Sequence, residues 1–223
     1  NYQYIKISYK NKNYEFKTDL IGKIQIKNLL MAVAAALKCN LKIDRIVKSL
    51  KYIKPVDGRL EFIGKTKDNS IVILDYAHTP EALKTCIENI KEHFSSRKIK
   101  IVFGCGGNRD KQKRPIMGKI ANNLCNSIYL TDDNPRGENP KKIRSDIKKF
   151  ISKSKLVEIS SRKLAIRNAI LNSKSDEIVI IAGKGHEKTQ EYSTEKVFSD
   201  RENIKKSIIC LLYTSPSPRD TNE

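Results

Sequence analysis

The sequence predicts an α/β protein built on a doubly wound, mainly parallel β-sheet, and three observations support that prediction. From about residue 70, short runs of apolar, β-branched residues alternate with longer amphipathic stretches. Such alternation is typical of parallel sheets with helices on both faces. Polar clusters containing glycine follow several of the expected strands. Hydrophobic residues make up 39% of the 223 residues and charged residues 31%, which suffices for a packed core and excludes a disordered chain.

The first 70 residues predict a smaller set of elements. Residues 4–8 and 14–18 alternate as short strands do, and helices are expected over residues 27–38, which are rich in alanine, and 43–50. These elements cannot bury a sheet of their own size. We therefore expect this region to be the end of a larger domain whose beginning lies outside the sequence.

The elements after residue 70 follow in regular order. Thr79, Pro80 and Glu81 supply an N-cap, a first-turn proline and a first-turn acidic residue for the first helix of this region. Its last strand is the most strongly apolar segment of the chain. The expected strands cover residues 71–74, 99–103, 127–130, 156–159 and 177–181, and the expected helices cover residues 80–94, 115–125, 140–151, 162–171 and 201–211.

The end of the chain loses this periodicity. Residues 213–223, YTSPSPRDTNE, carry Ser-Pro repeats and resemble read-through from a cloning or sequencing adapter, so we exclude them from the fold prediction. The predicted organisation is a truncated first domain over residues 1–67, a complete α/β domain over residues 68–212, and a non-native or disordered tail over residues 213–223.

Composition excludes several classes of protein. No stretch approaches the roughly 18 to 20 uncharged apolar residues that span a bilayer, and residues 1–9 lack the basic-then-apolar order of a secretory signal. We therefore expect no membrane span. The five cysteines are odd in number and never form a CxxC pair, so neither a disulfide framework nor a zinc site is predicted. This usage fits the reducing cytoplasm.

The chain is strongly basic, with 44 lysines and arginines, 25 aspartates and glutamates, and a net charge of +19. Such a charge suits a nucleic-acid-binding protein. The lysines are spread along the whole chain, however, and no basic stripe is interleaved with the aromatic residues that stack bases. We expect no specific nucleic-acid partner, while anionic small molecules remain plausible ligands.

Four polar clusters follow the expected strands, at the ends where open parallel sheets bind ligands. Taken singly, each has an ordinary explanation. A glycine-rich turn provides tight geometry, His78 or His186 can be structural, and Asp132 with Asp133 suits a solvated loop better than a metal site. The four clusters are DYAH at residues 75–78, GCGGNRD at 104–110, DDNPR at 132–136 and GKGHE at 183–187.

In this order the clusters resemble the Mur ligases of peptidoglycan synthesis, and among them the members that add meso-diaminopimelate. The resemblance extends over about residues 22–209. Its most specific motif is DNPR at residues 133–136, which marks the diaminopimelate pocket in that family. The resemblance implies a Rossmann-like C-terminal domain preceded by the tail of the central ATPase domain.

Arg136 is the residue of this motif with the clearest chemical purpose. Diaminopimelate differs from lysine by one carboxylate at its far end, and a guanidinium pairs with a carboxylate through two parallel hydrogen bonds. The resemblance implies further residues for the same ligand: Arg109 on the other side of the pocket, Asp133 and Asn134 for the far amino-acid head group, and Gly183 and Glu187 for its ammonium group.

The resemblance also implies part of an ATP site. Asn28 would face the adenine and Arg59, which follows a glycine, would contact the nucleotide. Asp75 would contact the ribose, with His78 beside it. An ion pair between Arg59 and Asp75 across two domains is the alternative interpretation of those two residues.

Some parts of the family's pattern differ or are not in this sequence. Gln25 stands where an asparagine usually precedes the alanine-rich helix, and Asn108 stands where aspartate usually follows GCGG. The sequence contains no GxxGK[ST] phosphate loop and no upstream glutamate and histidine for magnesium. We therefore expect that this chain does not catalyse the family's reaction alone. We also expect it to be a monomer.

That reaction, as the resemblance implies it, is an ATP-dependent and Mg²⁺-dependent amide ligation. The D-glutamate carboxylate of UDP-N-acetylmuramoyl-L-alanyl-D-glutamate is phosphorylated, and the amine of diaminopimelate attacks the acyl phosphate. Two alternatives within the superfamily are a lysine-adding ligase and a folylpolyglutamate-type ligase, and the DNPR motif disfavours both. A non-catalytic anion-binding module is the alternative from another class of protein.

Overall fold

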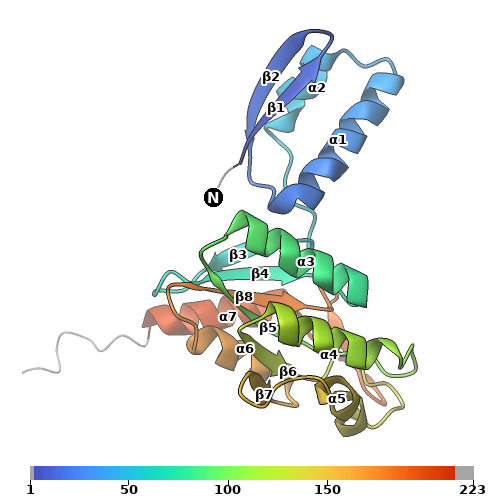
Figure 1. The fold of residues 1–223 in the computed structure, drawn as a ribbon, viewed down its shortest axis with the longest axis vertical. Coiled ribbons are helices and arrows are strands. Elements are labelled where there is room, and N and C mark those ends of the chain that lie inside the picture. Colours follow the sequence, from blue (N-terminus) through green and yellow to red (C-terminus); the bar gives the residue numbers. More distant parts are fainter. Residues whose placement is uncertain (1–2, 214–223) are drawn as a thin grey trace, which may run out of the picture. The chain divides into compact units, whose positions relative to one another are not determined.

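The computed structural model describes residues 3–213 and divides the chain into two compact units, Asn1–Val56 and Asp57–Glu223 (Figure 1). The second unit begins before the boundary expected between residues 67 and 68. The reason is β3 (Glu61–Lys65), which pairs with β4 (Ile71–Asp75) and so belongs to the sheet of the second unit. Most of the expected tail, residues 214–223, lies outside the described residues.

The first unit consists of a hairpin and two helices. β1 (Gln3–Tyr9) and β2 (Lys12–Thr18) pair antiparallel, and α1 (Gly22–Lys38) and α2 (Ile43–Leu50) follow. Helix α1 begins five residues earlier than expected, because its buried side is formed by residues that include a glycine and a glutamine, which an apolar pattern does not reveal. The buried residues of α1 are Gly22, Gln25, Leu29 and Val33.

The second unit is organised around a six-stranded sheet in the order β3-β4-β8-β5-β6-β7. Strand β3 is antiparallel to β4, and the other neighbours are parallel. The remaining strands are β5 (Lys98–Phe103), β6 (Ser127–Leu130), β7 (Leu156–Glu158) and β8 (Glu177–Ala182). Each of them lies within about one residue of its predicted position, and the antiparallel strand β3 was not predicted.

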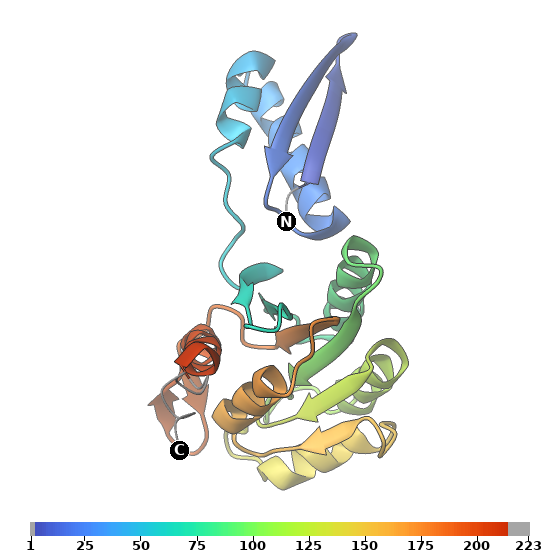
Figure 2. The same cartoon turned by 90° about the vertical axis from the view of Figure 1, so that its left-hand side faces the viewer.

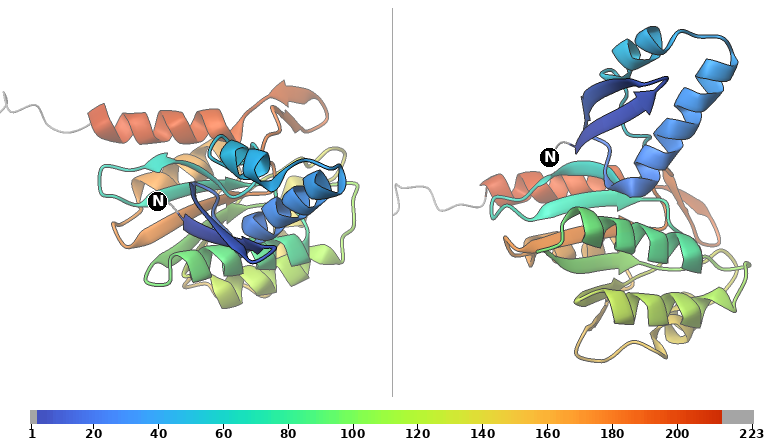
Figure 3. Two further views of the ribbon diagram at one scale, coloured as in Figure 1. Left: turned by 90° about the horizontal axis from the view of Figure 1, so that it is seen from above. Right: turned by 45° about the horizontal axis from the view of Figure 1, so that its top comes forward.

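Helices cover both faces of this sheet (Figures 2 and 3). The chain advances from β4 through β5 and β6 to β7, then returns to β8 between β4 and β5. Because crossovers between parallel strands are right-handed, the reversal places the returning helix on the other face. One face carries α3 (Pro80–His93), α4 (Lys113–Leu124) and α5 (Pro140–Lys148), and the other carries α6 (Arg162–Leu171) and α7 (Asp200–Tyr213). The predicted doubly wound fold is confirmed.

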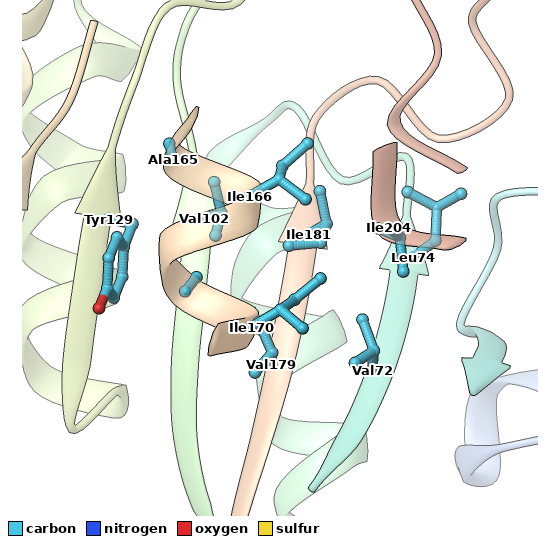
Figure 4. Packing of buried hydrophobic residues seen from close by; sticks show 11 residues of the cluster. Val72, Leu74, Val102, Tyr129, Ala165, Ile166, Ile170, Val179, Ile181 and Ile204 are labelled. Carbon is cyan, nitrogen blue, oxygen red and sulfur yellow. The ribbon is translucent and has the colours of Figure 1, made fainter. Parts of the chain in front are cut away.

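The core beneath α6 and α7 follows from strand alternation (Figure 4). Val72 and Leu74 of β4 and Val179 and Ile181 of β8 point to the same face, because every second side chain of a strand does so. They meet apolar side chains of the two helices, Ala165, Ile166, Ala169, Ile170 and Ile204. Strands β4 and β8 are apolar along nearly their whole length. Their packing holds the carboxyl edge of the sheet in a fixed position.

The carboxyl edge is the part of the fold that positions a ligand site. The loops that follow β5 and β8 leave the sheet toward opposite faces, and in open α/β sheets such a reversal opens a crevice between neighbouring strands. A short hairpin of β9 (Thr189–Glu191) and β10 (Glu195–Val197) follows the β8 loop. Within residues 3–213, no helix is long and apolar enough to cross a membrane.

Candidate functional site

A cavity of about 450 Å³ lies at the carboxyl edge of the sheet in the second unit. Loops that follow β4, β5, β6 and β8 contribute to its walls. All six residues predicted for diaminopimelate line this one cavity, together with His78 from the β4 loop: Arg109, Asp133, Asn134, Arg136, Gly183 and Glu187. The structure thus brings together residues separated by up to four strands in the sequence.

The glycine-rich loop after β5 packs directly against the loop after β6. Gly107 N donates a hydrogen bond to Asn134 O at 2.8 Å, and a Cβ added to Gly107 would lie 1.8 Å from Pro135 O. Only glycine allows this approach. Asn108 has a φ of 52°, in the left-handed region that asparagine adopts more readily than most residues. The glycines of this loop therefore form the expected tight turn, and two of them, Gly104 and Gly106, also line the cavity.

Arg136 is held by three groups. Its Nε lies 2.8 Å from Glu191 Oε2, and its Nη1 donates to Gly107 O at 3.0 Å and Asn134 O at 3.4 Å. Arg136 N donates to Glu191 O at 3.1 Å, which ties the loop to β9. Within residues 3–213 these contacts engage Nε and Nη1, so the Nη2 edge is the part of the guanidinium that a ligand carboxylate would meet.

The two aspartates after β6 are buried, so the solvated-loop interpretation was wrong. Asp132 is 6% exposed and accepts hydrogen bonds from Arg144 Nη1 and, at 3.1 Å, from Tyr192 OH. Burial and the neighbouring charge of Asp132 raise the pKa of Tyr192 to about 12. Asp133 is 8% exposed and its Oδ2 lies 3.8 Å from Arg162 Nη1. Arg144 and Arg162 balance the charges of these two carboxylates.

Asn134 and Glu187 meet at the end of β8. Asn134 Nδ2 donates to Glu187 Oε2 at 3.2 Å. Lys184, which has no exposed surface, donates to both residues from below, at 2.8 Å to Asn134 Oδ1 and 2.7 Å to Glu187 Oε2. Gly183 has a φ of 112°, and a Cβ there would lie 2.9 Å from Asp133 Oδ2. A side chain at Gly183 would therefore be strained and would press on the aspartate.

Buried cations beneath the cavity are the site residues that the sequence did not reveal. Arg162 donates to Asp200 through Nε at 2.8 Å and Nη2 at 2.7 Å, and to Ala182 O at 2.9 Å. Burial alone would lower the pKa of Arg162, but the charge of Asp200 raises it above its ordinary value. Arg114 is likewise fully buried and bonds Glu138 at 3.0 Å.

The residues predicted for ATP divide between the two units. Asp75 is 6% exposed, and its carboxylate accepts from Leu60 N and Ala77 N, each at 2.8 Å. Burial raises the pKa of Asp75, and those two hydrogen bonds oppose the rise. Arg59 lies over the Tyr76 ring, 4.7 Å from its centroid. Asp75 therefore fixes the backbone beside Arg59, and its contact with a ribose stays a prediction.

His78 and Asn28 complete the predicted ATP residues. His78 Nδ1 lies 2.9 Å from Tyr76 O, a carbonyl that can only accept, so Nδ1 carries the hydrogen of this bond. Asn28 lies on the exposed side of α1, in the first unit. Within residues 3–213, no group of three or more His, Cys, Asp and Glu side chains is arranged to hold a metal ion.

The cavity thus combines cations and carboxylates on facing loops. Arg109 and Arg136 suit ligand carboxylates, whereas Asp133 and Glu187 suit a ligand ammonium. An amino acid with charged groups at both ends fits this distribution better than a simple anion does. A comparison of the sequence with known families matches residues 58–185 to the Mur ligase, glutamate ligase domain, over more than half of the chain.

The chain belongs to the Mur ligase family.

Mur ligases whose names specify diaminopimelate are similar to this chain over most of its length. UDP-N-acetylmuramoyl-L-alanyl-D-glutamate--2,6-diaminopimelate ligase from Rickettsia montanensis is 44% identical over 210 residues, which cover 92% of this chain and 43% of that protein. The protein of the same name from Chelativorans is 39% identical over 207 residues, covering 92% and 42%. This chain therefore spans less than half the length of these Mur ligases.

Solved structures agree with the fold. A structure of UDP-N-acetylmuramoyl-L-alanyl-D-glutamate--2,6-diaminopimelate ligase matches with a TM-score of 0.71 at 33% identity and covers 95% of this chain and 43% of that one. Folylpolyglutamate synthase from Mycobacterium tuberculosis matches with a TM-score of 0.62 at 17% identity, covering 77% and 40%. The second likeness shows a shared fold alone.

Proposed function

We propose that this chain supplies the amino-acid pocket of an ATP-dependent ligase that adds meso-diaminopimelate to UDP-N-acetylmuramoyl-L-alanyl-D-glutamate in peptidoglycan synthesis. The observation that carries the proposal is the convergence of Arg109, Arg136 and Glu187 on one cavity. The names of the similar Mur ligases support the same substrate. A lysine-adding role is disfavoured, because lysine offers Arg136 no second carboxylate.

Five residues of the cavity have a definite task in this proposal, and Asp133 joins Asn134 in holding the far amino-acid head group. The Nη2 edge of Arg136 and the amide of Asn134 bind the far carboxylate, while Glu187 and the carbonyl of Gly183 bind the far ammonium. Arg109 binds the carboxylate nearer to the reacting amine. Anchoring both ends of diaminopimelate in this way holds its reacting amine in one orientation. The loss of translational and rotational entropy then occurs on binding, which lowers the entropic part of the activation barrier.

In this proposal the ligation proceeds in two steps, phosphorylation of a carboxylate and then formation of the amide. The D-glutamate γ-carboxylate takes the terminal phosphoryl group of ATP, giving an acyl phosphate and ADP. The nitrogen lone pair of diaminopimelate then attacks the acyl carbon, the C–N bond forms, inorganic phosphate leaves and the amine loses a proton. The part of this chain in the second step is to orient the amine.

Fewer residues of this chain are proposed to contact ATP than to contact diaminopimelate. Arg59, Asp75 and His78 contribute from the second unit and Asn28 from the first, as the family resemblance implies. The magnesium ligands are expected outside this chain, as the family resemblance implies. Such an enzyme draws on ATP and UDP-linked precursors and would act in the cytoplasm, as a monomer without a specific nucleic-acid partner.

Calorimetric titration tests the pocket. The unaltered chain is expected to bind meso-diaminopimelate and to bind L-lysine far more weakly. An Arg136→Ala variant should lose on the order of 2 to 5 kcal/mol of binding free energy, because the far carboxylate is left buried and unpaired. Arg167→Ala, at an exposed position of α6, serves as a control with the same change of charge. Equal affinity for lysine and diaminopimelate would contradict the proposal.

A second experiment tests the expectation that the chain binds without turnover. Purified protein incubated with ATP and Mg²⁺ should release no phosphate above background, because the sequence contains no GxxGK[ST] phosphate loop. Hydrolysis of ATP that disappears in an Arg59→Ala variant would show that this chain holds a complete nucleotide site, contrary to the proposal.

A further inference from the structure

Lys184 is fully buried at the end of β8, although lysine is seldom fully buried unless it is paired. Its ammonium donates to Asn134 Oδ1 at 2.8 Å and Glu187 Oε2 at 2.7 Å. An ammonium has three donors and no acceptor. Both of these oxygens must therefore turn toward Lys184, and both residues also line the cavity.

The orientation of the Asn134 amide follows from its neighbours. Glu191 N also donates to Asn134 Oδ1, at 3.0 Å, so two groups that cannot accept a hydrogen bond flank this oxygen. Rotating the amide by 180° would place its NH₂ group against Lys184. Asn134 Nδ2 uses one hydrogen on Glu187 Oε2 at 3.2 Å. Its second hydrogen is the group that Asn134 offers to the cavity, and it suits a carboxylate.

Glu187 is oriented by the same contacts. Its Oε2 accepts from both Lys184 and Asn134, which leaves Oε1 to accept from a ligand ammonium. The cavity wall thus carries the Asn134 donor beside the Glu187 acceptor in a fixed arrangement. A carbon centre that bears a carboxylate, an ammonium and a chain anchored elsewhere can match this arrangement in one handedness only. In the centre of opposite handedness, the carboxylate would meet Glu187 and the ammonium would meet Asn134.

We infer that Lys184 is a positioning residue that sets the handedness of the far amino-acid centre accepted by the cavity. The inference rests on the proposed function and adds a source for its stereoselectivity. Lys184 touches no ligand in this scheme. It acts by fixing the donor of Asn134 and the acceptor of Glu187, so that a D-centre at the far end, which the meso isomer can supply and the LL isomer cannot, binds in preference to an L-centre.

The test is the ratio of affinities for meso- and LL-diaminopimelate, measured by calorimetry on the 223-residue chain. In Lys184→Met the amide of Asn134 loses one of the two donors that fix its oxygen, and Glu187 loses its cationic partner, so the meso-to-LL ratio should fall on the order of tenfold. The Glu187 side chain is 31% exposed, so water can solvate its carboxylate in the variant and the fold should persist. An unchanged ratio would overturn the positioning role.

Lys100→Met is the matched control. Lys100 is 4% exposed and also forms a buried ion pair, 3.0 Å from Glu177 Oε2, with a bond to Asn172 O at 2.6 Å. It does not line the cavity. Losing this lysine should lower stability and leave the affinity ratio unchanged, so the ratio separates positioning from general destabilisation.

A second measurement needs no substitution at Lys184. In unaltered protein labelled with ¹⁵N, saturating meso-diaminopimelate should shift the side-chain resonance of Asn134 Nδ2, and the LL isomer at the same concentration should shift it less. No shift with bound meso-diaminopimelate would overturn the inference and leave the proposed function standing. Binding of L-lysine as tight as that of meso-diaminopimelate would instead overturn the proposed function itself.

Discussion

At the scale of single residues, buried cations beneath the cavity each hold one of the surrounding loops. Arg144 bonds Asp132 after β6, and Lys184 bonds Asn134 and Glu187. Arg162 bonds the end of β8 through Ala182 O. Because each cation is desolvated, its hydrogen-bonded partners must stay in place, and the groups that line the cavity are held rigidly as a result.

Removing one partner of the Arg162–Asp200 pair should be costly. Both side chains are fully buried, so Arg162→Met leaves Asp200 as an unpaired buried charge, and the free energy of unfolding should fall by about 3 to 5 kcal/mol. The double variant Arg162→Met/Asp200→Leu should recover much of that loss. Urea denaturation measures both, with Arg167→Met as an exposed control. A double variant as unstable as the single one would contradict this account.

Thiol reactivity gives a prediction with a definite pH dependence. Burial raises the pKa of Cys105 and of Cys125 to about 12, whereas Cys39 and Cys210 are exposed. At pH 8 iodoacetamide should modify the two exposed cysteines and spare the buried ones. Because the thiolate is the reactive form, the rate at Cys105 should rise about tenfold per pH unit below its pKa. Mass spectrometry of tryptic peptides measures each site, and rapid modification of Cys105 at pH 8 would refute the prediction.

The residues that line the cavity were predictable, but those that hold them in place were not. Arg136 stands in a specific motif, and a guanidinium matches the carboxylate that distinguishes diaminopimelate from lysine. Lys184 stands in the GKGHE cluster, but its burial and that of Arg162 were not predicted, because a lysine or arginine in a sequence is ordinarily a surface residue. Arg162 is buried by a partner 38 residues away, Asp200, and such a distant pairing is fixed by the fold rather than by local pattern.

At the scale of elements, strand β9 acts as a support for the loop after β6. Gln190 Nε2 donates to Asp133 O at 2.7 Å, and Glu191 N donates to Asn134 Oδ1 at 3.0 Å. The return bond runs from Arg136 N to Glu191 O. The loop is therefore bonded along its length by one short strand, which explains how Arg136 keeps a φ of 53°.

A substitution that adds one methyl group can test whether ligand binding needs the close packing of the β5 loop on the β6 loop. Gly107→Ala places a Cβ 1.8 Å from Pro135 O, so the two loops must separate and diaminopimelate affinity should fall at least about tenfold. Gly137→Ala is the matched control in the next loop, since its Cβ would lie 3.5 Å from Asn108 Nδ2, an ordinary contact. Equal affinity in the two variants, measured by calorimetry, would show that the approach is not needed for binding.

Long apolar elements were predicted well, and short polar ones were missed. Strands β4 and β8 are buried along their length, so their apolar runs were unmistakable. Strand β3 carries a bulge between Phe62 and Gly64 and alternates only weakly, and β9 has three residues, TQE. Their pairing is fixed by tertiary contacts, which outweigh intrinsic preference in so short a segment.

At the scale of the whole molecule, the net charge of +19 predicts nonspecific association with nucleic acid. Binding to a random DNA duplex should be measurable at about 50 mM salt and lost by about 200 mM, because it depends on release of counterions. Fluorescence anisotropy with two unrelated duplexes measures this. A complex that persists at the higher salt with one duplex but not the other would favour the nucleic-acid-binding alternative.

The fold class was predictable at this scale because the alternation of strands and helices repeats. The order of strands within the sheet was not predicted, since periodicity shows that β8 is a buried strand but not that it lies between β4 and β5. That order depends on long-range packing, and it decides which loops face the cavity.

The place of β8 has a consequence for how the protein is made. During translation β8 is the last of the six strands to leave the ribosome, yet it pairs with both β4 and β5. Until it emerges, those two strands keep open edges while α4, α5 and α6 are synthesised, an interval of several seconds at about 5 to 20 residues per second. Exposed strand edges invite pairing with other chains. The nascent chain is therefore most vulnerable to aggregation just before its ligand cavity can form.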